Sequence, residues 1–323
     1  MTQPLKIGSR SSLLALTQSR WVKSELKRFH PDLEVEIIEI STTGDQKLAA
    51  SLQELGGKGA FTLELEQAML DGSADIAVHS LKDLPTDLPV GLKLLCTPLR
   101  EQTHDVIVFR DPLPGGAEPS DPLAHLSEGA VVGTSSLRRK AQLLAARPDL
   151  KVVEFRGNVG TRLDKLNAGQ VDATLLAAAG LLRLGLLDDQ RSPQRVDGRF
   201  DALPLGAAIW YPAVGQGALG IEGRAQDERV ARLLAPLHDA GTFAAAAAER
   251  AFLNELGAGC QAPVGALAVA PEGSSLKLAG AILSVDGTRI VEGEGSGDIA
   301  HPDDLGRSIA RDCLGRGAQE LLP

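Results

Sequence analysis

Residues 130–167 read AVVGTSSLRRKAQLLAARPDLKVVEFRGNVGTRLDKLN, and this stretch decides the fold class. A short apolar strand at 130–132 is followed by a polar turn and by a helix that begins near Leu137. A second strand at 152–155 is followed by a second polar turn and by a helix that ends near Asn167. Strands that alternate with helices at this spacing are typical of α/β folds. The stretch therefore predicts a sheet with helices on both faces and polar turns at the carboxyl ends of its strands.

The same alternation continues in both directions from this stretch. On the N-terminal side the hydrophobic pattern predicts helices at 11–28 and 60–71 and strands at 5–7, 33–40, 74–78, 92–96 and 105–109. On the C-terminal side it predicts a strand at 173–176, a helix that ends near 187, further helices at 230–237, 244–256 and 305–322, and a hairpin of 276–284 with 288–294. Residues 188–212 show no regular period and are predicted to be a loop. We expect mixed or mostly parallel sheets.

Length and composition are those of a soluble globular protein. The chain has 323 residues, enough for two or three domains of about 100–200 residues each. Apolar residues make up 43% and charged residues 23%, which excludes a disordered chain, a collagen-like chain and a small disulfide scaffold. The longest strongly apolar stretch, 173–182, is far shorter than the roughly 20 residues that cross a bilayer. The N-terminal sequence lacks a signal-peptide pattern, so we expect a cytoplasmic protein with no membrane partner.

The charge of the chain is unevenly distributed. The net charge of −9 argues against a general nucleic-acid binder, so we expect no nucleic-acid partner. Residues 134–165 nevertheless carry eight basic and three acidic residues. This segment therefore has a local charge of +5 in a chain that is acidic overall.

Cysteine usage excludes some kinds of site and leaves others open. The three cysteines, Cys96, Cys260 and Cys313, are odd in number and widely spaced, which fits neither a disulfide framework nor a zinc site, and we expect no bound metal. Cys96 and Cys313 lie in apolar surroundings, but Cys260 lies in the loop LGAGCQAP at 256–263. A loop thiol can be a nucleophile, a covalent anchor or an incidental side chain, and the pattern does not choose among these.

Arginine follows several of the predicted strands. The turn GTSSLRR at 133–139 places three hydroxyls and two arginines at the start of a helix, where free backbone N–H groups favour an anion. A plain Ser/Thr cap before a basic helix face explains this turn equally well. RGNVGTR at 156–162 repeats the arrangement, and Arg10 follows the first strand. The repetition predicts a site for a ligand with several carboxylates.

The sequence HSLKD at 79–83 follows a short buried strand and contains a candidate acid–base pair. Lys82 and Asp83 are adjacent, and a cleft mouth at this position would tune the pKa of both side chains. The alternative is a solvated surface pair, which is common in proteins.

Nine short stretches, in one order along the chain, together identify a family: IGSRSSLLAL, GGKGAF, DIAVHSLKDLP, GTSSLRR, RGNVGTRL, AAGLLRLG, PAVGQGALGIE, AER and GAGCQAPVG. Any one of them is weak evidence, but over nearly the whole chain the set is similar to the porphobilinogen deaminase family. The resemblance implies three α/β domains. The first two would resemble the lobes of a type II periplasmic-binding-protein fold, and the third would be a smaller α/β domain with an antiparallel sheet.

The resemblance also implies domain boundaries. The first domain would comprise 1–98 plus 218–235, the second 104–211, and the third 240–323, which carries the cofactor-anchoring cysteine. The segment 97–104, which the pattern leaves between two strands, would be a crossover between the lobes.

The implied activity is a transferase reaction of porphyrin and heme biosynthesis. Four molecules of porphobilinogen, the small-molecule substrate, would be joined head to tail, with loss of ammonia at each step. The linear tetrapyrrole hydroxymethylbilane would then be released. Growth would take place on a dipyrromethane cofactor that is bound through a thioether to Cys260. A monomer is expected.

The resemblance assigns roles residue by residue. Asp83 matches the catalytic aspartate, which would hold pyrrole N–H groups and stabilise the azafulvene cation that forms as ammonia leaves. The residues that would bind the cofactor are Ser80, Lys82, Asp83, Thr134, Ser135, Ser136, Arg138 and Arg139. Those that would bind substrate are Arg10, Ser12, Arg156, Arg162, Arg183 and Gln216. Lys58 and Phe61 match a mobile loop over the cleft and are expected to form a lid.

Two other interpretations compete with this one. A non-catalytic, two-lobed anion-binding protein would explain the arginines at strand ends. It would not explain Cys260 or the pair of Lys82 and Asp83. A catalytically inactive relative has no support, because the residues that would do the chemistry are present.

Overall fold

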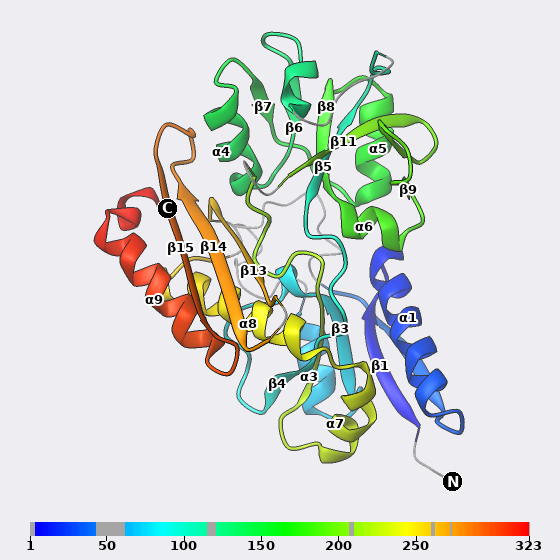
Figure 1. The fold of residues 1–323 in the computed structure, drawn as a ribbon. Coiled ribbons are helices and arrows are strands. Elements are labelled where there is room, and N and C mark those ends of the chain that lie inside the picture. Colours follow the sequence, from blue (N-terminus) through cyan, green and yellow to red (C-terminus); the bar gives the residue numbers. More distant parts are fainter. Residues whose placement is uncertain are drawn as a thin grey trace.

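The computed structural model describes residues 4–42, 62–114, 121–206, 210–259, 262–271 and 273–322. Within these ranges the strands form a five-stranded, a seven-stranded and a three-stranded sheet. Figure 1 shows the five-stranded sheet in the lower part of the molecule, the seven-stranded sheet above it and the three-stranded sheet at the left. We call the first two sheets, with their helices, the first lobe and the second lobe, and the remainder the third domain. The predicted α/β class with three domains is confirmed.

The first lobe contains strands from two distant parts of the chain. Its sheet has the order β2-β1-β3-β12-β4, formed by β1 (Leu5–Arg10), β2 (Val35–Ile40), β3 (Ile76–Ser80), β4 (Leu92–Cys96) and β12 (Leu219–Arg224). β1 is parallel to β2 and β3, whereas β12 is antiparallel to β3 and β4. Its helices are α1 (Leu13–Phe29), α3 (Leu63–Leu70) and α7 (Glu228–Leu234), with short 3₁₀ turns at η1 (Leu81–Asp83) and η3 (Ala235–Leu237). Apolar side chains of α1, such as Val22 and Leu26, pack on the fully buried Leu5 and Ile7 of β1.

The second lobe repeats this connectivity and adds strands at one edge. Its sheet has the order β7-β6-β8-β5-β11-β10-β9, formed by β5 (Asp105–Phe109), β6 (Val131–Gly133), β7 (Lys151–Val153), β8 (Ala173–Ala177), β9 (Leu187–Asp188), β10 (Gln194–Val196) and β11 (Phe200–Leu205). As β12 does in the first lobe, β5 enters from the other lobe and pairs antiparallel with both neighbours. The helical segments are η2 (Pro122–His125), α4 (Leu137–Ala146), α5 (Val159–Asn167) and α6 (Ala178–Arg183). In each lobe one strand is therefore formed by a segment of the chain that has just crossed from the other lobe.

The prediction of a loop over 188–212 is wrong, because this stretch contains β10 and β11 and part of β9. β11 has the sequence FDALPL and is buried along nearly its whole length, so it shows no polar alternation that would reveal a strand. Asp201 and Pro204 within it further weaken the strand signal. Two smaller deviations concern α6, which ends at Arg183, and the strand predicted at 152–155. That strand is β7, which starts one residue earlier and ends two residues earlier than predicted.

The third domain is an antiparallel sheet covered by two helices. β13 (Val264–Val269), β14 (Ser275–Leu283) and β15 (Ile290–Asp298) are packed against α8 (Ala240–Glu255) and α9 (Pro302–Gly315). The predicted hairpin is confirmed, with Gly287 in its turn at a φ of 74°. β13 was not predicted, and the closing helix ends at Gly315, before a 3₁₀ turn η4 (Ala318–Leu321). Gly317, at a φ of 90°, separates α9 from η4.

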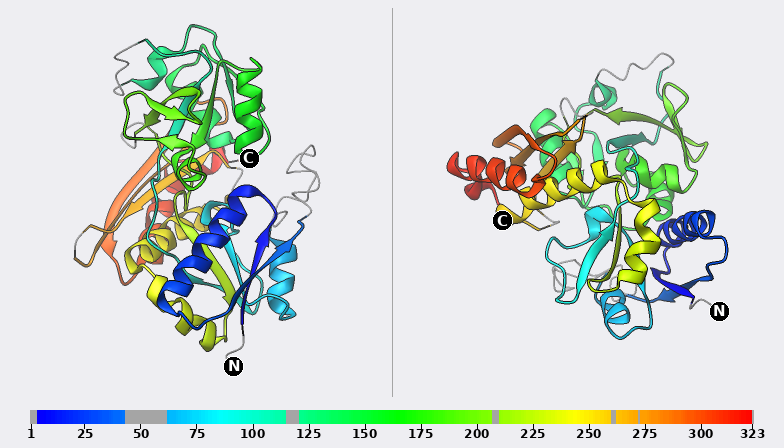
Figure 2. Two further views of the ribbon diagram at one scale, coloured as in Figure 1. Left: turned by 90° about the vertical axis from the view of Figure 1, so that its right-hand side faces the viewer. Right: turned by 60° about the horizontal axis from the view of Figure 1, so that its bottom comes forward.

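The third domain touches both lobes, as two further views show (Figure 2). On the second lobe, the hairpin tip lies so close to α4 that a Cβ on Gly287 would be 2.5 Å from the backbone nitrogen of Ala145. On the first lobe, the guanidinium of Arg250 donates to the carbonyl oxygens of Leu84, Pro85 and Thr86, the residues that follow Asp83.

A buried carboxylate of the third domain fastens both connections between the lobes. Glu249 on α8 accepts hydrogen bonds from Nη1 and Nη2 of Arg100, at 2.7 and 3.0 Å. It also accepts from the backbone N–H groups of Gly215, at 2.6 Å, and Ala268, at 2.8 Å. Arg100 lies between β4 and β5, and Gly215 lies between β11 and β12. The two connections therefore meet at one fully buried side chain.

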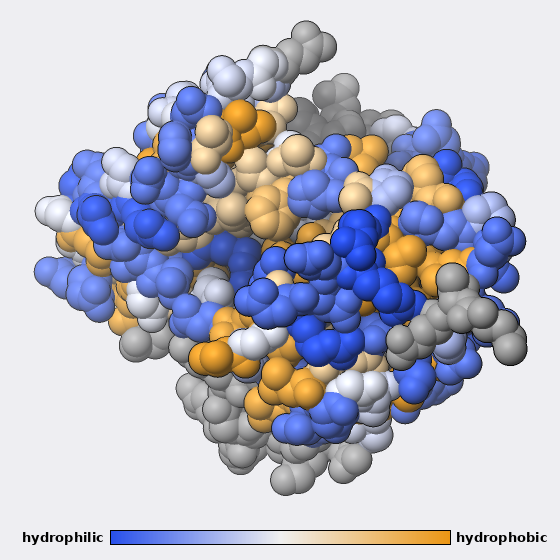
Figure 3. Space-filling view, turned by 90° about the horizontal axis from the view of Figure 1, so that it is seen from below, coloured by the Kyte–Doolittle hydropathy of each residue, from blue (hydrophilic) through white to orange (hydrophobic). Residues whose placement is uncertain are grey.

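One face of the molecule and the lengths of its helices bear on membrane contact. Seen from below, the molecule is covered mainly by hydrophilic residues, with apolar residues in scattered groups (Figure 3). Among the helices in the described ranges, none combines the length and apolar content that crossing a bilayer requires.

Candidate functional site

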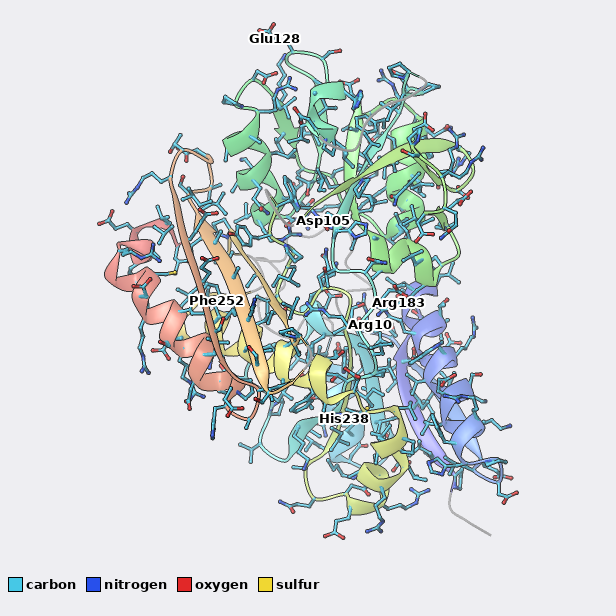
Figure 4. The ribbon with its side chains drawn as sticks, in the orientation of Figure 1. Arg10, Asp105, Glu128, Arg183, His238 and Phe252 are labelled. Carbon is cyan, nitrogen blue, oxygen red and sulfur yellow. The ribbon has the colours of Figure 1, made fainter. Side chains whose placement is uncertain are left out.

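The residues assigned to a ligand site follow strands of both lobes. In the first lobe Arg10 ends β1 and Ser80 ends β3, and in the second lobe the turn 134–136 follows β6. Asp105 begins the antiparallel strand β5 and pairs with Ala177, the last residue of β8, so it lies at the same edge of its sheet as the ends of the parallel strands. Arg10, Arg183 and Asp105 all lie near the boundary between the lobes (Figure 4). In open α/β folds, ligands bind outside the carboxyl ends of the strands, which is where these residues lie.

A chain of hydrogen bonds crosses that boundary. Lys82, on η1 of the first lobe, donates from Nζ to Oε1 of Gln216, at 3.2 Å. Nε2 of Gln216 donates to the carbonyl oxygen of Thr103, at 2.7 Å, and to Oδ1 of Asp105, at 2.9 Å. The predicted site residue Gln216 thus connects a cation of one lobe to a carboxylate of the other.

Asp105 accepts five hydrogen bonds and is fully buried. Arg139 donates to it from Nη2 and Nε, at 2.7 and 3.2 Å, and Arg138 donates from Nη2, at 2.9 Å. Nε1 of Trp210 donates at 2.9 Å. Burial would raise the pKa of Asp105, but the charges of Arg138 and Arg139 outweigh burial and hold that pKa well below its usual range. Asp105 is therefore an anion at neutral pH.

Arg138 and Arg139 are more enclosed than the sequence suggested. They are 4% and 6% exposed, and besides Asp105 they donate to the carbonyl oxygens of Tyr211 and Leu175. A ligand carboxylate would have to bind those guanidinium N–H groups of Arg138 and Arg139 that do not already donate within the protein. Their assignment as cofactor-binding residues stays a prediction.

Four cations near the boundary, Lys82, Arg138, Arg162 and Arg183, have lowered pKa values. Burial lowers the pKa of Lys82 to about 8, with Arg138 and Arg139 also lowering it and with Asp83 and Asp105 acting in the opposite direction. Burial and the charge of Arg139 lower the pKa of Arg162 to about 10, against the effect of Asp83. An anion that entered beside these cations would favour their charged forms.

Asp83 is the most accessible charged residue in this group. It ends the 3₁₀ turn η1 and is exposed, unlike Leu81 at the start of the turn, which is buried. In the described part of the chain, no hydrogen bond reaches its carboxylate. Its oxygens are thus open to N–H donors of a ligand, while Lys82 beside it faces Gln216.

The hydroxyls after β6 all accept backbone N–H groups. Thr134 accepts from the N–H of Ser136, at 3.2 Å, and Ser136 accepts from that of Arg139, at 3.4 Å, so Ser136 caps α4. Ser135 accepts from the N–H of Phe155, at 3.1 Å. A hydroxyl that accepts from the backbone still has its own O–H to donate. This arrangement leaves the three hydroxyls able to donate to a carboxylate.

The remaining candidates are placed less uniformly. The hydroxyl of Ser12 accepts from the N–H of Ala15, at 3.3 Å, and caps α1, whereas that of Ser80 accepts from Nε2 of Gln18, at 2.7 Å. Arg183 donates to the carbonyl oxygen of Gly217, at 2.7 Å, and burial lowers its pKa to about 10.

Arg156 forms an ion pair with Glu154, with 2.6 Å between Nε and Oε1. Three candidates, Cys260, Lys58 and Phe61, lie outside the described residues.

Sequence reasoning gave no role to the two buried carboxylates that organise this region, although Glu249 lies in the quoted AER stretch. Asp105 opens the apolar strand DVIVF, and Glu249 lies in an alanine-rich helix. A charged residue inside an otherwise apolar element is a detectable signal, since such residues are seldom buried without a partner. The partners themselves, Arg100 and Trp210 among them, are distant in sequence and could not be found this way.

The arrangement suits an organic polyanion. Hydroxyls and guanidinium groups can donate to several carboxylates, and the open carboxylate of Asp83 can accept from N–H groups or stabilise positive charge. In the described ranges, no group of three or more His, Cys, Asp and Glu side chains could hold a metal ion.

Comparison with known proteins gives matches over nearly the whole chain. The family model "Porphobilinogen deaminase, dipyromethane cofactor binding domain" matches residues 5–232, and "Porphobilinogen deaminase, C-terminal domain" matches residues 243–315. The porphobilinogen deaminase of Syntrophotalea carbinolica is 44% identical over 98% of this chain and 95% of its own length. Those of Roseiflexus castenholzii and Desulforudis audaxviator are 47% and 48% identical over 100% of this chain and 99% and 98% of theirs.

Similarity to solved structures is weaker. The reduced OxyR regulatory domain of Pseudomonas aeruginosa is 18% identical, with a TM-score of 0.41 over 72% of this chain and 93% of that one. A periplasmic arginine-binding protein of Salmonella typhimurium is 12% identical, with a TM-score of 0.40 over 73% of this chain and 92% of its own.

Proposed function

The chain belongs to the porphobilinogen deaminase family, and we propose that it joins four porphobilinogens head to tail and releases hydroxymethylbilane. At each step the aminomethyl C–N bond of one porphobilinogen breaks, ammonia leaves, and the remaining pyrrolylmethyl group is joined to the growing chain. This is a transfer reaction of tetrapyrrole synthesis. The observation that carries the proposal is the group at the boundary between the lobes. There the open carboxylate of Asp83 interacts electrostatically with Lys82 and with Arg162, and the charge of Arg139 acts on both of these cations.

Asp83 would act on the reacting end of the substrate. Its carboxylate accepts pyrrole N–H groups and stabilises the positive charge that develops on the substrate as ammonia departs. The exposure of Asp83 supports this role, because a carboxylate already bonded within the protein could not accept those donors.

The other side chains would hold the carboxylates of substrate and product. Arg10, Arg156, Arg162 and Arg183 would bind acetate and propionate groups, with Ser12 adding a hydroxyl contact. Gln216 would contribute through Lys82, which it already contacts.

The residues present fit a covalently held dipyrromethane. The matching family model for residues 5–232 is that of the domain that binds this cofactor. Thr134, Ser135 and Ser136 retain O–H groups for its carboxylates, and Lys82 is a cation whose lowered pKa an anionic group would raise. When bound, the group supplies the pyrrole end to which the first substrate is joined. Its attachment at Cys260, on the loop after α8, follows from the family motif.

Several further features belong to the proposal. The domains would comprise 1–98 plus 218–235, then 104–211, then 240–323. The sheets are consistent with this division, because β12 pairs within the first lobe. Lys58 and Phe61 would form a lid over the boundary, and the protein would act as a cytoplasmic monomer.

Intact-protein mass spectrometry, followed by peptide mapping, tests the proposal. An adduct of dipyrromethane mass on the peptide that contains Cys260 is expected. Cys260→Ala should lack it, and the matched variant Cys313→Ala, at a buried cysteine of the same domain, should retain it. If neither the purified protein nor protein incubated with porphobilinogen carries an adduct, the deaminase proposal fails and a non-catalytic anion-binding protein takes its place.

A further inference from the structure

We propose that Asp105 is a positioning residue of this site, which holds Arg138, Arg139 and, through Gln216, Lys82 in one arrangement across the boundary between the lobes. The inference rests on the proposed function and extends it to a residue that no family motif or sequence pattern had singled out. Asp105 is fully buried, so it acts through its neighbours and not by touching substrate.

The hydrogen bonds of Asp105 fix the two arginines in orientation. Oδ1 accepts from Nη2 of Arg139 and Oδ2 accepts from Nε of the same guanidinium, which is a two-pronged contact. Oδ2 also accepts from Arg138 and from Trp210. Because both oxygens have several donors, the carboxylate cannot rotate without breaking bonds to more than one side chain.

The same carboxylate fixes the amide of Gln216. Nε2 of Gln216 donates to Asp105 and to the carbonyl oxygen of Thr103, both of which only accept. The amide oxygen must then point the other way, toward Nζ of Lys82. A reversed amide would direct its NH₂ group at an ammonium and its oxygen at a carboxylate, both unfavourable. The position of Lys82 therefore depends on the charge and place of Asp105.

The charge balance around Lys82 leads to a measurable consequence. The cations Arg138 and Arg139 and the anions Asp83 and Asp105 all act on Lys82. Arg162 is near Asp83 and Arg139 and adds a further positive charge to the group. When the charge of Asp105 is removed, two guanidinium groups lose their counter-ion, and the ammonium form of Lys82 becomes less favourable.

The first experiment measures the titration of Lys82 in the holoenzyme. Trace labelling of amines with a small acylating reagent, across pH 6–10, is quantified by mass spectrometry of the peptide that contains Lys82. In Asp105→Asn the midpoint should fall by about one pH unit, a tenfold loss of proton affinity. The pH at which bilane formation declines on the alkaline side should fall by the same amount. An unchanged midpoint in a folded Asp105→Asn protein overturns the proposal.

A matched control separates positioning from general destabilisation. Asp201 is also a buried aspartate of the second lobe, and it accepts from Arg195 and from the N–H of Leu113. Asp201→Asn should leave the Lys82 midpoint unchanged. A fall equal to that of Asp105→Asn would mean that any disturbance of the lobe moves it, and would refute a specific role for Asp105.

A second variant covers the case in which Asp105→Asn does not fold. Gln216→Met keeps every charge but removes the acceptor of Lys82, so the midpoint should fall, by less than one pH unit. An unchanged Lys82 midpoint in Gln216→Met would overturn the connection through Gln216. If the unsubstituted holoenzyme forms no bilane, the proposed function fails, while the titration still decides the role of Asp105.

Discussion

Replacement of Glu249 by glutamine should destabilise the whole protein, because this carboxylate fastens both connections between the lobes. Oε1 accepts from Nη1 of Arg100 and from the N–H of Ala268, and Oε2 accepts from Nη2 of Arg100 and from the N–H of Gly215. A glutamine has one oxygen and one NH₂ group. Whichever way the amide is turned, its NH₂ group faces two donors.

The size of the effect follows from the burial of the pair. Removing one partner from a buried ion pair costs about 3–5 kcal/mol, and Glu249 and Arg100 have side chains that are 0% and 10% exposed. An unfolding entropy of about 2.1 cal/mol/K per residue gives about 0.7 kcal/mol/K for 323 residues. If the chain unfolds as one unit, the Tm of Glu249→Gln should fall by about 4–7 °C.

Thermal unfolding followed by circular dichroism measures this change. The control is Glu228→Gln, which breaks an exposed pair with Arg232 in which Glu228 is 86% exposed, and which should shift Tm by less than about 1 °C. A shift for Glu249→Gln no larger than that of the control would refute the reasoning. It would mean that the connections between the lobes do not depend on this carboxylate.

Three further variants test other parts of the structure. Asp83→Ala should lower bilane formation by at least about a hundredfold, as measured by product absorbance, and leave Tm within about 1 °C, because the side chain is exposed. Persistent turnover would exclude the role given to Asp83. Gly287→Ala should cost about 1–3 kcal/mol and speed hydrogen exchange in α4, because its Cβ would lie 2.5 Å from the nitrogen of Ala145; unchanged exchange would contradict the close packing. In a Cys260→Ala background, Lys82 should make the free energy of unfolding rise as the pH rises from 8 to 10.5. In that range the unfolded chain keeps the Lys82 proton, whereas the folded protein, with a pKa of about 8, has released it. Urea midpoints compared with and without Lys82→Met measure that gain, and equal slopes against pH would argue against the lowered pKa.

The local pattern predicted the elements well where one face of each was solvated. α1, α4 and α5 have clear apolar faces and capping residues, and α4 begins at Leu137, where its start was predicted, after Ser136 as its cap. β11 was missed because it is buried on both faces, which removes the alternation on which a strand prediction depends.

Apart from what the family resemblance implied, the residue pattern predicted the site only as a set of strand ends. Arginines and hydroxyls at those ends indicated an anion site, because the ends of parallel strands meet at one edge. The sequence did not indicate that Arg138 and Arg139 share Asp105 as a counter-ion, since the pairing joins residues 33 and 34 positions apart. Such pairings depend on the register of the assembled sheet, which no local pattern contains.

The exchange of strands between the lobes also determines the order in which the two sheets can be completed during synthesis. In the described residues β4 pairs only with β12, which is made more than a hundred residues later in the chain. All strands of the second lobe lie between Asp105 and Leu205, so its sheet can be complete while β4 still has an open edge. Unpaired strand edges are prone to aggregate. The nascent first lobe is therefore the part of the molecule that needs protection until the ribosome has delivered Leu219–Arg224.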